Sequence, residues 1–122
     1  MTTKIPAKTF RDLIIWQYGM KVSKEVYNLT KKFPKKEDYT LTSQMRRCAI
    51  SIPSNIAEGF LRKHNTEYKQ FLRIALGSSG ELETQLEIAF NAEYITEEQK
   101  NTLLQNLVSI RRMTLNLIKC LK

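Results

Sequence analysis

Apolar residues recur at helical spacing along nearly the whole chain, and few residues interrupt them. Only three prolines and four glycines occur among the 122 residues, while 42% of the residues are hydrophobic. Apolar side chains that return every three or four positions lie on one face of a helix. The pattern therefore favours a few long helices over many short strands, and the length suits one domain with a single core.

The first two predicted helices are bounded by a proline and by threonines. The first covers about residues 10–32 and ends at Phe33-Pro34, because the residue before a proline avoids helical dihedral angles. The second starts at Thr40 or Thr42, either of which can cap a helix. It runs to about Lys63.

The third predicted helix covers about residues 65–92, and a short turn separates it from the fourth. The fourth opens at Thr96, which matches a capping box with Gln99 three positions later. Short connections require antiparallel neighbours, so we predict an all-α, up-down-up-down antiparallel four-helix bundle. Residues 1–122 form this single domain, with residues 1–9 as a flexible N-terminal arm.

The second predicted helix contains residues that helix interiors normally exclude. Pro53 cannot donate a backbone hydrogen bond to Ala49, so we predict a kink there, with the freed carbonyl satisfied by a side chain or water. The alternative is a split helix with Pro53 in the first turn of its second half. All four glycines also fall inside helices, at a cost of about 1 kcal/mol each. Close helix packing explains them; the alternative is a break at Gly59 or between Gly77 and Gly80.

A polar row follows one face of the same helix between two apolar rows, and the next helix offers polar side chains to meet it. Charges in such a row need partners if they are buried. We predict a structural polar seam in which acids meet arginines and which sets the bundle register or forms a subunit contact. The alternative is a binding pocket or an RNA-phosphate contact. The seam consists of the acids Glu58 and Glu81, the arginines Arg47, Arg62 and Arg73, and Ser51, Asn55 and Ser78.

Charge is strongly segregated along the sequence. The formal net charge is +8, of which residues 1–36 carry +7, residues 37–80 +2, residues 81–98 −6 and residues 99–122 +5. This segregation can attract an anionic partner such as RNA, or place basic and acidic faces of neighbouring subunits together. The third possibility is a solvated basic surface.

Few aromatic residues lie between the basic ones, so we expect electrostatic binding of nucleic acid with little readout of base sequence. The candidate nucleic-acid-binding residues are Lys21, Lys24, Lys31, Lys32, Lys35 and Lys36, with Arg111, Arg112 and Lys119 as a second set.

No pattern of catalytic or metal-binding residues accompanies these charges. His64 is the only histidine, and it lies at a predicted helix junction, where a solvated side chain is far commoner than a catalytic base. Phosphate-binding glycine loops, metal-ligand clusters and nucleophile elbows are absent from the sequence. We therefore expect a protein that is not an enzyme and has no cofactor.

The compartment is predicted from the cysteines and from the apolar runs. Cys48 and Cys120 are far apart without a pairing pattern, which indicates buried thiols in a reducing compartment; a disulfide is the alternative. The N-terminus lacks the apolar core of a signal peptide, and no apolar run approaches the roughly 18–20 residues that span a bilayer. We expect a soluble, cytoplasmic protein with no membrane partner.

The central segment resembles the signature of a known family. SIPSNIAEG at residues 51–59, with Gln44 and Arg47 before it and Arg62 after it, is similar to the bacterial four-helix-bundle family. This family is also called the ribosomal-protein-S23-like or 23S rRNA intervening-sequence family. Further matches are FRDLIIWQ at 10–17, FPKKEDYTLTSQ at 33–44 and GSSGELETQLEIA at 77–89. The resemblance covers nearly the whole chain and implies a small helical bundle without established catalytic residues.

The resemblance also implies an assembly and a partner. A related group, the accessory proteins of diversity-generating retroelements, is similar to pentameric, basic, nucleic-acid-binding barrels. A homo-oligomer, in particular a pentamer, is therefore expected. The leading expectation is a non-catalytic, weakly sequence-specific RNA binder. The rival is a protein-interaction scaffold or accessory subunit that docks an acidic partner.

Overall fold

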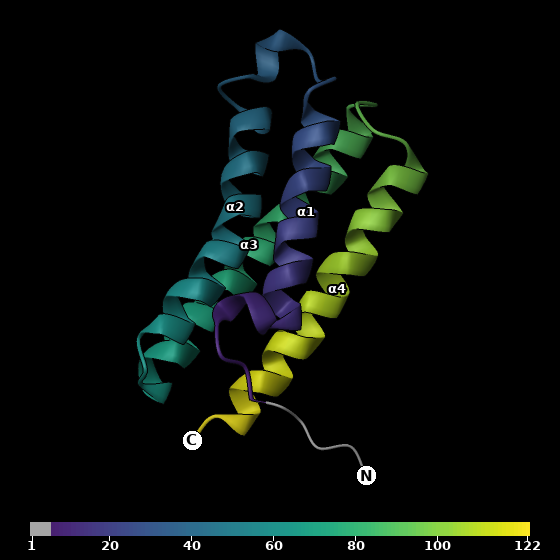
Figure 1. Ribbon diagram of the computed structural model, residues 1–122. Coiled ribbons are helices and arrows are strands. Elements are labelled where there is room, and N and C mark those ends of the chain that lie inside the picture. Colours follow the sequence, from purple (N-terminus) through teal and green to yellow (C-terminus); the bar gives the residue numbers. More distant parts are fainter. Residues whose placement is uncertain (1–5) are drawn as a thin grey trace.

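Four long helices form where the apolar periodicity predicts them. A computed structural model of the chain describes residues 6–122, and all the regular structure in that part is helical. The α-helices are α1 (Ile14–Thr30), α2 (Leu41–Leu61), α3 (Asn65–Asn91) and α4 (Glu97–Cys120), with short 3-10 helices η1 (Phe10–Asp12) and η2 (Lys35–Glu37). Figure 1 shows the four α-helices packed side by side, with the α1–α2 and α3–α4 connections at the same end. The predicted all-α bundle is confirmed.

The start of α4 confirms the predicted capping box. Thr96 Oγ1 accepts a hydrogen bond from the Gln99 amide at 3.1 Å, and Gln99 Oε1 accepts one from the Thr96 amide at 2.9 Å. The two side chains thereby satisfy amides that have no partner within the helix.

The first predicted helix is divided, which is a correction. Leu13 has extended backbone angles and separates η1 from α1, so α1 begins at Ile14 and not at residue 10. Asp12 Oδ2 accepts hydrogen bonds from the amides of Lys8 and Thr9, at 2.9 and 3.1 Å, and fixes this short turn. Of the predicted N-terminal arm, residues 1–5 lie outside the part that the structure describes.

All four α-helices contribute to one apolar core. Met45, Ile52 and Ile56 of α2 share this core with Val22 and Val26 of α1 and with residues of α3 and α4. Fully burying a side chain of this size contributes roughly 1.5–3 kcal/mol. The core residues from the last two helices include Leu72, Leu82, Leu86, Leu103, Leu107 and Ile110, each with no more than 1% of its surface exposed.

Pro53 lies buried inside a continuous α2, so the split-helix alternative is wrong. Pro53 has no backbone N–H to donate to the carbonyl of Ala49. That carbonyl instead accepts a hydrogen bond from Ser23 Oγ of α1 at 3.0 Å. The proline ring packs against Gly19, where an added Cβ would lie 3.2 Å from Pro53 Cβ and Cδ. The predicted side-chain partner for the carbonyl is thus present. A kink of the helix axis stays a prediction.

The glycines divide into two classes. Gly59 is held in a close approach of α2 and α3, because a Cβ there would lie 2.9 Å from Phe71 Cβ and 3.0 Å from Tyr68 Cδ1. Gly77 and Gly80 have no atom within 4 Å of an added Cβ, and α3 runs through both without a break. Close packing within the chain therefore explains Gly19 and Gly59, and neither predicted explanation holds for Gly77 and Gly80.

We predict opposite effects of alanine at two of these positions. Gly59→Ala should lower the free energy of unfolding by about 1–2 kcal/mol, because the steric cost of overpacking exceeds the gain in helix propensity. Gly77→Ala, in open space, should raise it by up to about 1 kcal/mol. Urea unfolding of both variants measures the difference. A destabilising Gly77→Ala would contradict the open environment.

A hydrogen bond ties the two connections together at their shared end of the bundle. Tyr94 Oη donates to Glu37 Oε2 at 2.8 Å, and the Tyr94 and Phe33 rings are 5.2 Å apart. Thr40 Oγ1 donates to the other Glu37 oxygen at 2.7 Å. The hydrogen bonds from Thr40 and Tyr94 lower the pKa of Glu37, and the bond to Glu37 raises the pKa of Tyr94.

These pKa shifts predict a pH window for the contribution of Tyr94 to stability. A depressed carboxyl pKa stabilises the fold above the ordinary Glu pKa near 4.3. This stabilisation is lost as the pH falls through the pKa that Glu37 has in the folded state. A raised phenol pKa stabilises the fold below the ordinary Tyr pKa near 10. This stabilisation is lost as the pH rises through the pKa that Tyr94 has in the folded state. Tyr94→Phe should therefore lower the melting temperature most between these limits, and the difference should shrink at both extremes.

Tyr39→Phe is the matched control, because the Tyr39 side chain is 94% exposed. Melting temperatures of the wild type and both variants across the pH range test the prediction. A constant difference between wild type and Tyr94→Phe at every pH would show that the hydrogen bond to Glu37 is not the cause.

Candidate nucleic-acid interface

The first set of candidate lysines forms a basic row on the outside of the bundle. Lys21 and Lys24 of α1 and Lys31, the residue that follows its last turn, are exposed and follow one another at helical spacing over about 15 Å. Lys32 and the η2 residues Lys35 and Lys36, also exposed, continue the charge at the end of the bundle. Within residues 6–122, none of these six ammonium groups lies in an ion pair. Their charges are therefore not neutralised by the described part of the chain.

Arg46 adds a fixed positive charge beside this row, and the sequence analysis missed it. Its guanidinium lies 4.8 Å from the centre of the Tyr27 ring, and its Nε donates to Thr30 Oγ1 at 2.9 Å. Both partners belong to α1, so this α2 arginine is anchored next to the lysines of the other helix. Only the pairing of the two helices reveals this contact, since 16 positions separate Arg46 from Thr30.

Acidic residues lie at the same end of the bundle as the last four lysines. Glu93, Glu97 and Glu98 belong to the α3–α4 connection and the first turn of α4, and that connection meets η2 through Tyr94 and Glu37. Lys31, Lys32 and Glu98 even line one pocket between α1 and α4. The bundle end thus carries mixed charge, and along the α1 row Glu25 lies one turn from Lys21.

The second set of candidates lies on α4 and is separate from the first. Arg111, Arg112 and Lys119 are exposed. Arg111 is paired with Glu83 of α3 at 2.5 Å, which neutralises much of its charge. Lys119 is in the last turn of α4, at the opposite end of the bundle from η2 (Figure 1). The structure does not bring the two sets together.

The polar seam is centred on neutral side chains. Ser51 Oγ of α2 accepts hydrogen bonds from Ser78 Oγ of α3 at 2.7 Å and from Asn55 Nδ2 at 2.8 Å. Asn55 Nδ2 also donates to the Ser51 carbonyl at 2.8 Å. These bonds connect α2 and α3 at one point along their contact and involve no charge.

One predicted charge pair of the seam, Glu58 with Arg62, is present, but it lies on the surface. Glu58 and Arg62 pair at 2.9 Å, but their side chains are 50% and 47% exposed, so the pair belongs to the surface and contributes roughly 0–1 kcal/mol. Arg47 and Arg73 are exposed and form no ion pair within residues 6–122. The burial expected of these charges is wrong, because the helix turns their positions outward while Ser51 and Ser78 face the neighbouring helix.

Glu81 contacts a cysteine and not an arginine. The buried Cys48 thiol donates a long hydrogen bond of 3.8 Å to Glu81 Oε2, and Gln85 Nε2 donates to the Cys48 sulfur at 3.4 Å. Burial, followed by the effect of Glu81, raises the pKa of the Cys48 thiol, which disfavours the reactive thiolate. Both cysteines are free thiols, and Cys120 is exposed, which corrects the expectation that both are buried.

The remaining candidate features have no arrangement typical of a catalytic or metal site. His64 is exposed and precedes the first residue of α3. A search of residues 6–122 finds no cluster of three histidine, cysteine, aspartate or glutamate side chains that could hold a metal ion. Among the described helices, none combines the length and apolarity that a membrane crossing requires.

Comparisons with known proteins agree with the helical architecture. A crystal structure of a protein of unknown function from the S23 ribosomal protein family of Bacteroides thetaiotaomicron VPI-5482 superimposes with a TM-score of 0.80. The two chains are 25% identical, and the match covers 87% of this chain and 99% of the other. No curated protein matches the sequence.

The family is shown by the sequence itself, over most of its length. The family described as 23S rRNA-intervening sequence protein matches residues 11–116, which span all of α1, α2 and α3 and nearly all of α4. The resemblance noted at residues 51–59 is thereby confirmed, and this chain belongs to the 23S rRNA-intervening sequence protein family.

Proposed function

We propose that this chain is a non-catalytic, basic helical-bundle protein that binds RNA electrostatically in the cytoplasm as a homo-oligomer. The observation that carries the proposal is the row of exposed lysines along α1, which form no ion pair within residues 6–122, next to the anchored guanidinium of Arg46. Ammonium and guanidinium groups bind phosphates and release the counterions condensed on the nucleic acid, a source of affinity that does not depend on base sequence.

Weak sequence specificity follows from what lies around the row. Tyr27, the aromatic residue beside Arg46, already has its ring face covered by that guanidinium. Specific RNA recognition relies on bases that stack on free aromatic faces and form hydrogen bonds along their edges. The row itself offers ammonium groups that contact phosphates, so the proposed complex is held by the RNA backbone.

Exposed apolar residues support the homo-oligomer. Ile50 and Leu61 of α2 and Ile74 and Ile88 of α3 are 44–57% exposed, in a protein whose core is otherwise well filled. Single exposed apolar residues are common, but several on two adjacent helices are typical of a surface that a partner covers. A second copy of this chain is the partner that the family resemblance implies, and a pentamer is the expected assembly.

The RNA prediction concerns two double variants that remove the same charge. Lys24→Gln combined with Lys31→Gln should weaken binding to single-stranded polyuridine. The plot of the logarithm of the binding constant against the logarithm of the salt concentration should become less steep by about 1.4, or 0.7 for each lost phosphate contact. Arg112→Gln combined with Lys119→Gln should have a smaller effect, because these residues lie outside the α1 row. Fluorescence anisotropy between about 50 and 200 mM salt measures both.

Two outcomes would contradict RNA binding through this row. The first is an affinity for polyuridine no higher than for an uncharged polymer at low salt. The second is equal weakening by the two double variants, which would leave net charge as the cause. The rival function as a scaffold for an acidic protein predicts a partner that is captured in a pull-down and retained after nuclease treatment.

The oligomer prediction is tested by light scattering. At micromolar concentration the mass should be a multiple of the 14.3 kDa chain, with five copies as the expected number. Ile74→Asp should shift the assembly toward smaller species, because it places a charge on the apolar α3 surface. Ile14→Asp, at a residue that is also more than half exposed but lies at the start of α1, is the control. A monomeric wild type would exclude the homo-oligomer.

A further inference from the structure

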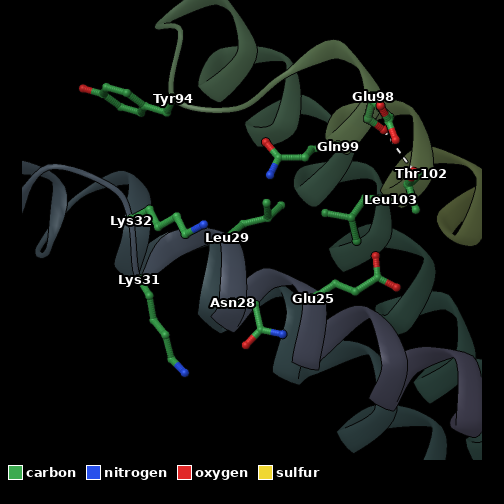
Figure 2. A pocket seen from close by; sticks show the side chains of 10 residues that line it. All are labelled: Glu25, Asn28, Leu29, Lys31, Lys32, Tyr94, Glu98, Gln99, Thr102 and Leu103. Carbon is green, nitrogen blue, oxygen red and sulfur yellow. Dashed lines mark hydrogen bonds between the residues drawn. The ribbon is translucent and has the colours of Figure 1, made fainter.

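A cavity of about 580 Å³ lies between the C-terminal half of α1 and the first turns of α4. This volume is within the range of roughly 300–1,000 Å³ that ligand pockets occupy. Leu29 and Leu103 provide an apolar floor, and the turn that carries Tyr94 bounds one end (Figure 2). The pocket is on the side of α1 that faces α4.

One end of the cavity carries a carboxylate without a cationic partner. Glu25 Oε1 accepts a hydrogen bond from Asn106 Nδ2 at 3.2 Å, which leaves Oε2 available. No ion pair within residues 6–122 includes Glu25, although Lys21 is one helical turn away. Burial raises the pKa of Glu25 more than Lys21 lowers it. A partly desolvated carboxylate of this kind gains most from an incoming ammonium group.

The other end of the cavity presents hydrogen-bond donors. Figure 2 shows the Lys32 side chain directed toward Leu29 and the Gln99 amide directed into the same space. Gln99 Oε1 is occupied by the Thr96 amide at 2.9 Å, so the Nε2 hydrogens remain to meet a ligand. An ammonium and an amide N–H group together suit a carboxylate or another small anion. Lys31 and Glu98 also belong to the lining of the cavity.

The two ends are separated by an apolar stretch. Glu25 and Lys32 are seven positions apart, which is about 10 Å along a helix axis, and the lysine side chain can shorten this span. Leu29 lies between them, and Leu103 of α4 is opposite. A matching molecule has a cation at one end, an anion at the other and a hydrocarbon segment between.

We propose that the cavity between α1 and α4 binds a linear zwitterion, an ω-amino acid or a ligand with the same three parts. The ammonium group binds the Glu25 carboxylate, the hydrocarbon segment packs on Leu29 and Leu103, and the anionic group binds Lys32 and Gln99. The site shares Lys31 and Lys32 with the first set of candidate lysines, but its recognition of a small zwitterion requires no nucleic acid. It therefore stands independently of the proposed RNA binding.

The test compares three probes of one length, namely 6-aminohexanoate, hexylamine and hexanoate. NMR titration of the full-length protein should show 6-aminohexanoate binding with a Kd on the order of 1 mM and shifting the amide signals of Leu29 and Leu103. Hexylamine and hexanoate, which each lack one charge, should bind at least about fivefold more weakly, the factor that roughly 1 kcal/mol represents.

Two variants assign the ends of the site. Glu25→Gln should remove the preference for 6-aminohexanoate over hexanoate, and Lys32→Gln should remove the preference over hexylamine. The matched controls are Glu58→Gln, on the exposed surface of α2, and Lys24→Gln, at an exposed α1 residue that does not line the cavity; both should bind like wild type. Melting curves of each variant establish that it is folded.

Several results would overturn the proposal. Equal affinity for the three probes would show that the charges do not recognise the ligand. Shifts at other amides, or no shifts at 10 mM probe, would show that the cavity is not the site. Equal weakening by Lys24→Gln and Lys32→Gln would reduce the effect to net charge, and so exclude the assigned anion contact.

Discussion

The contact between Pro53 of α2 and the α1 residues Gly19 and Ser23 is the constraint on which the bundle depends. A proline inside a helix removes one backbone hydrogen bond and crowds the preceding turn. Ser23 Oγ replaces the missing donor to Ala49, and Gly19 leaves room for the proline ring. The defect in one helix is thus compensated by the other, and the two are held at one relative position. A larger residue at Gly19 would disturb this position directly.

The continuity of α2 then determines which of its residues reach α3. Because the helix runs unbroken from Leu41 to Leu61, Ser51 and Asn55 keep helical spacing across Pro53. Ser51 thereby meets Ser78 at 2.7 Å, and Gly59, two turns later, allows the close approach of Tyr68 and Phe71. The unbroken geometry of α2 thus sets a polar contact and a steric contact with the same neighbour, α3. The charged side chains of the seam lie outside both contacts.

The sequence was sufficient to predict features that depend on local chemistry. The capping box at Thr96, the end of the first helix before Pro34 and the helical class of the whole chain follow from neighbouring residues alone. The family signature located the part of α2 where helices meet. The side-chain contacts between the helices also depend on how each helix is rotated about its axis. The sequence pattern determines this rotation only to within one row of residues. Glu58 was therefore expected inside and is half exposed, and Arg46 was overlooked although it is anchored against α1.

The rotation of α1 also separates two kinds of binding chemistry. Lys21 and Lys24 of α1 are exposed to solvent, where a long anionic polymer can reach both of them. Glu25 and Lys32 border the cavity toward α4, where only a small molecule fits between an acid and a base. Net charge alone does not distinguish these two surfaces, because lysines occur in both. The difference lies in enclosure: Glu25 and Lys32 line one cavity, whereas Lys21, one turn from Glu25, and Lys24 are open to solvent.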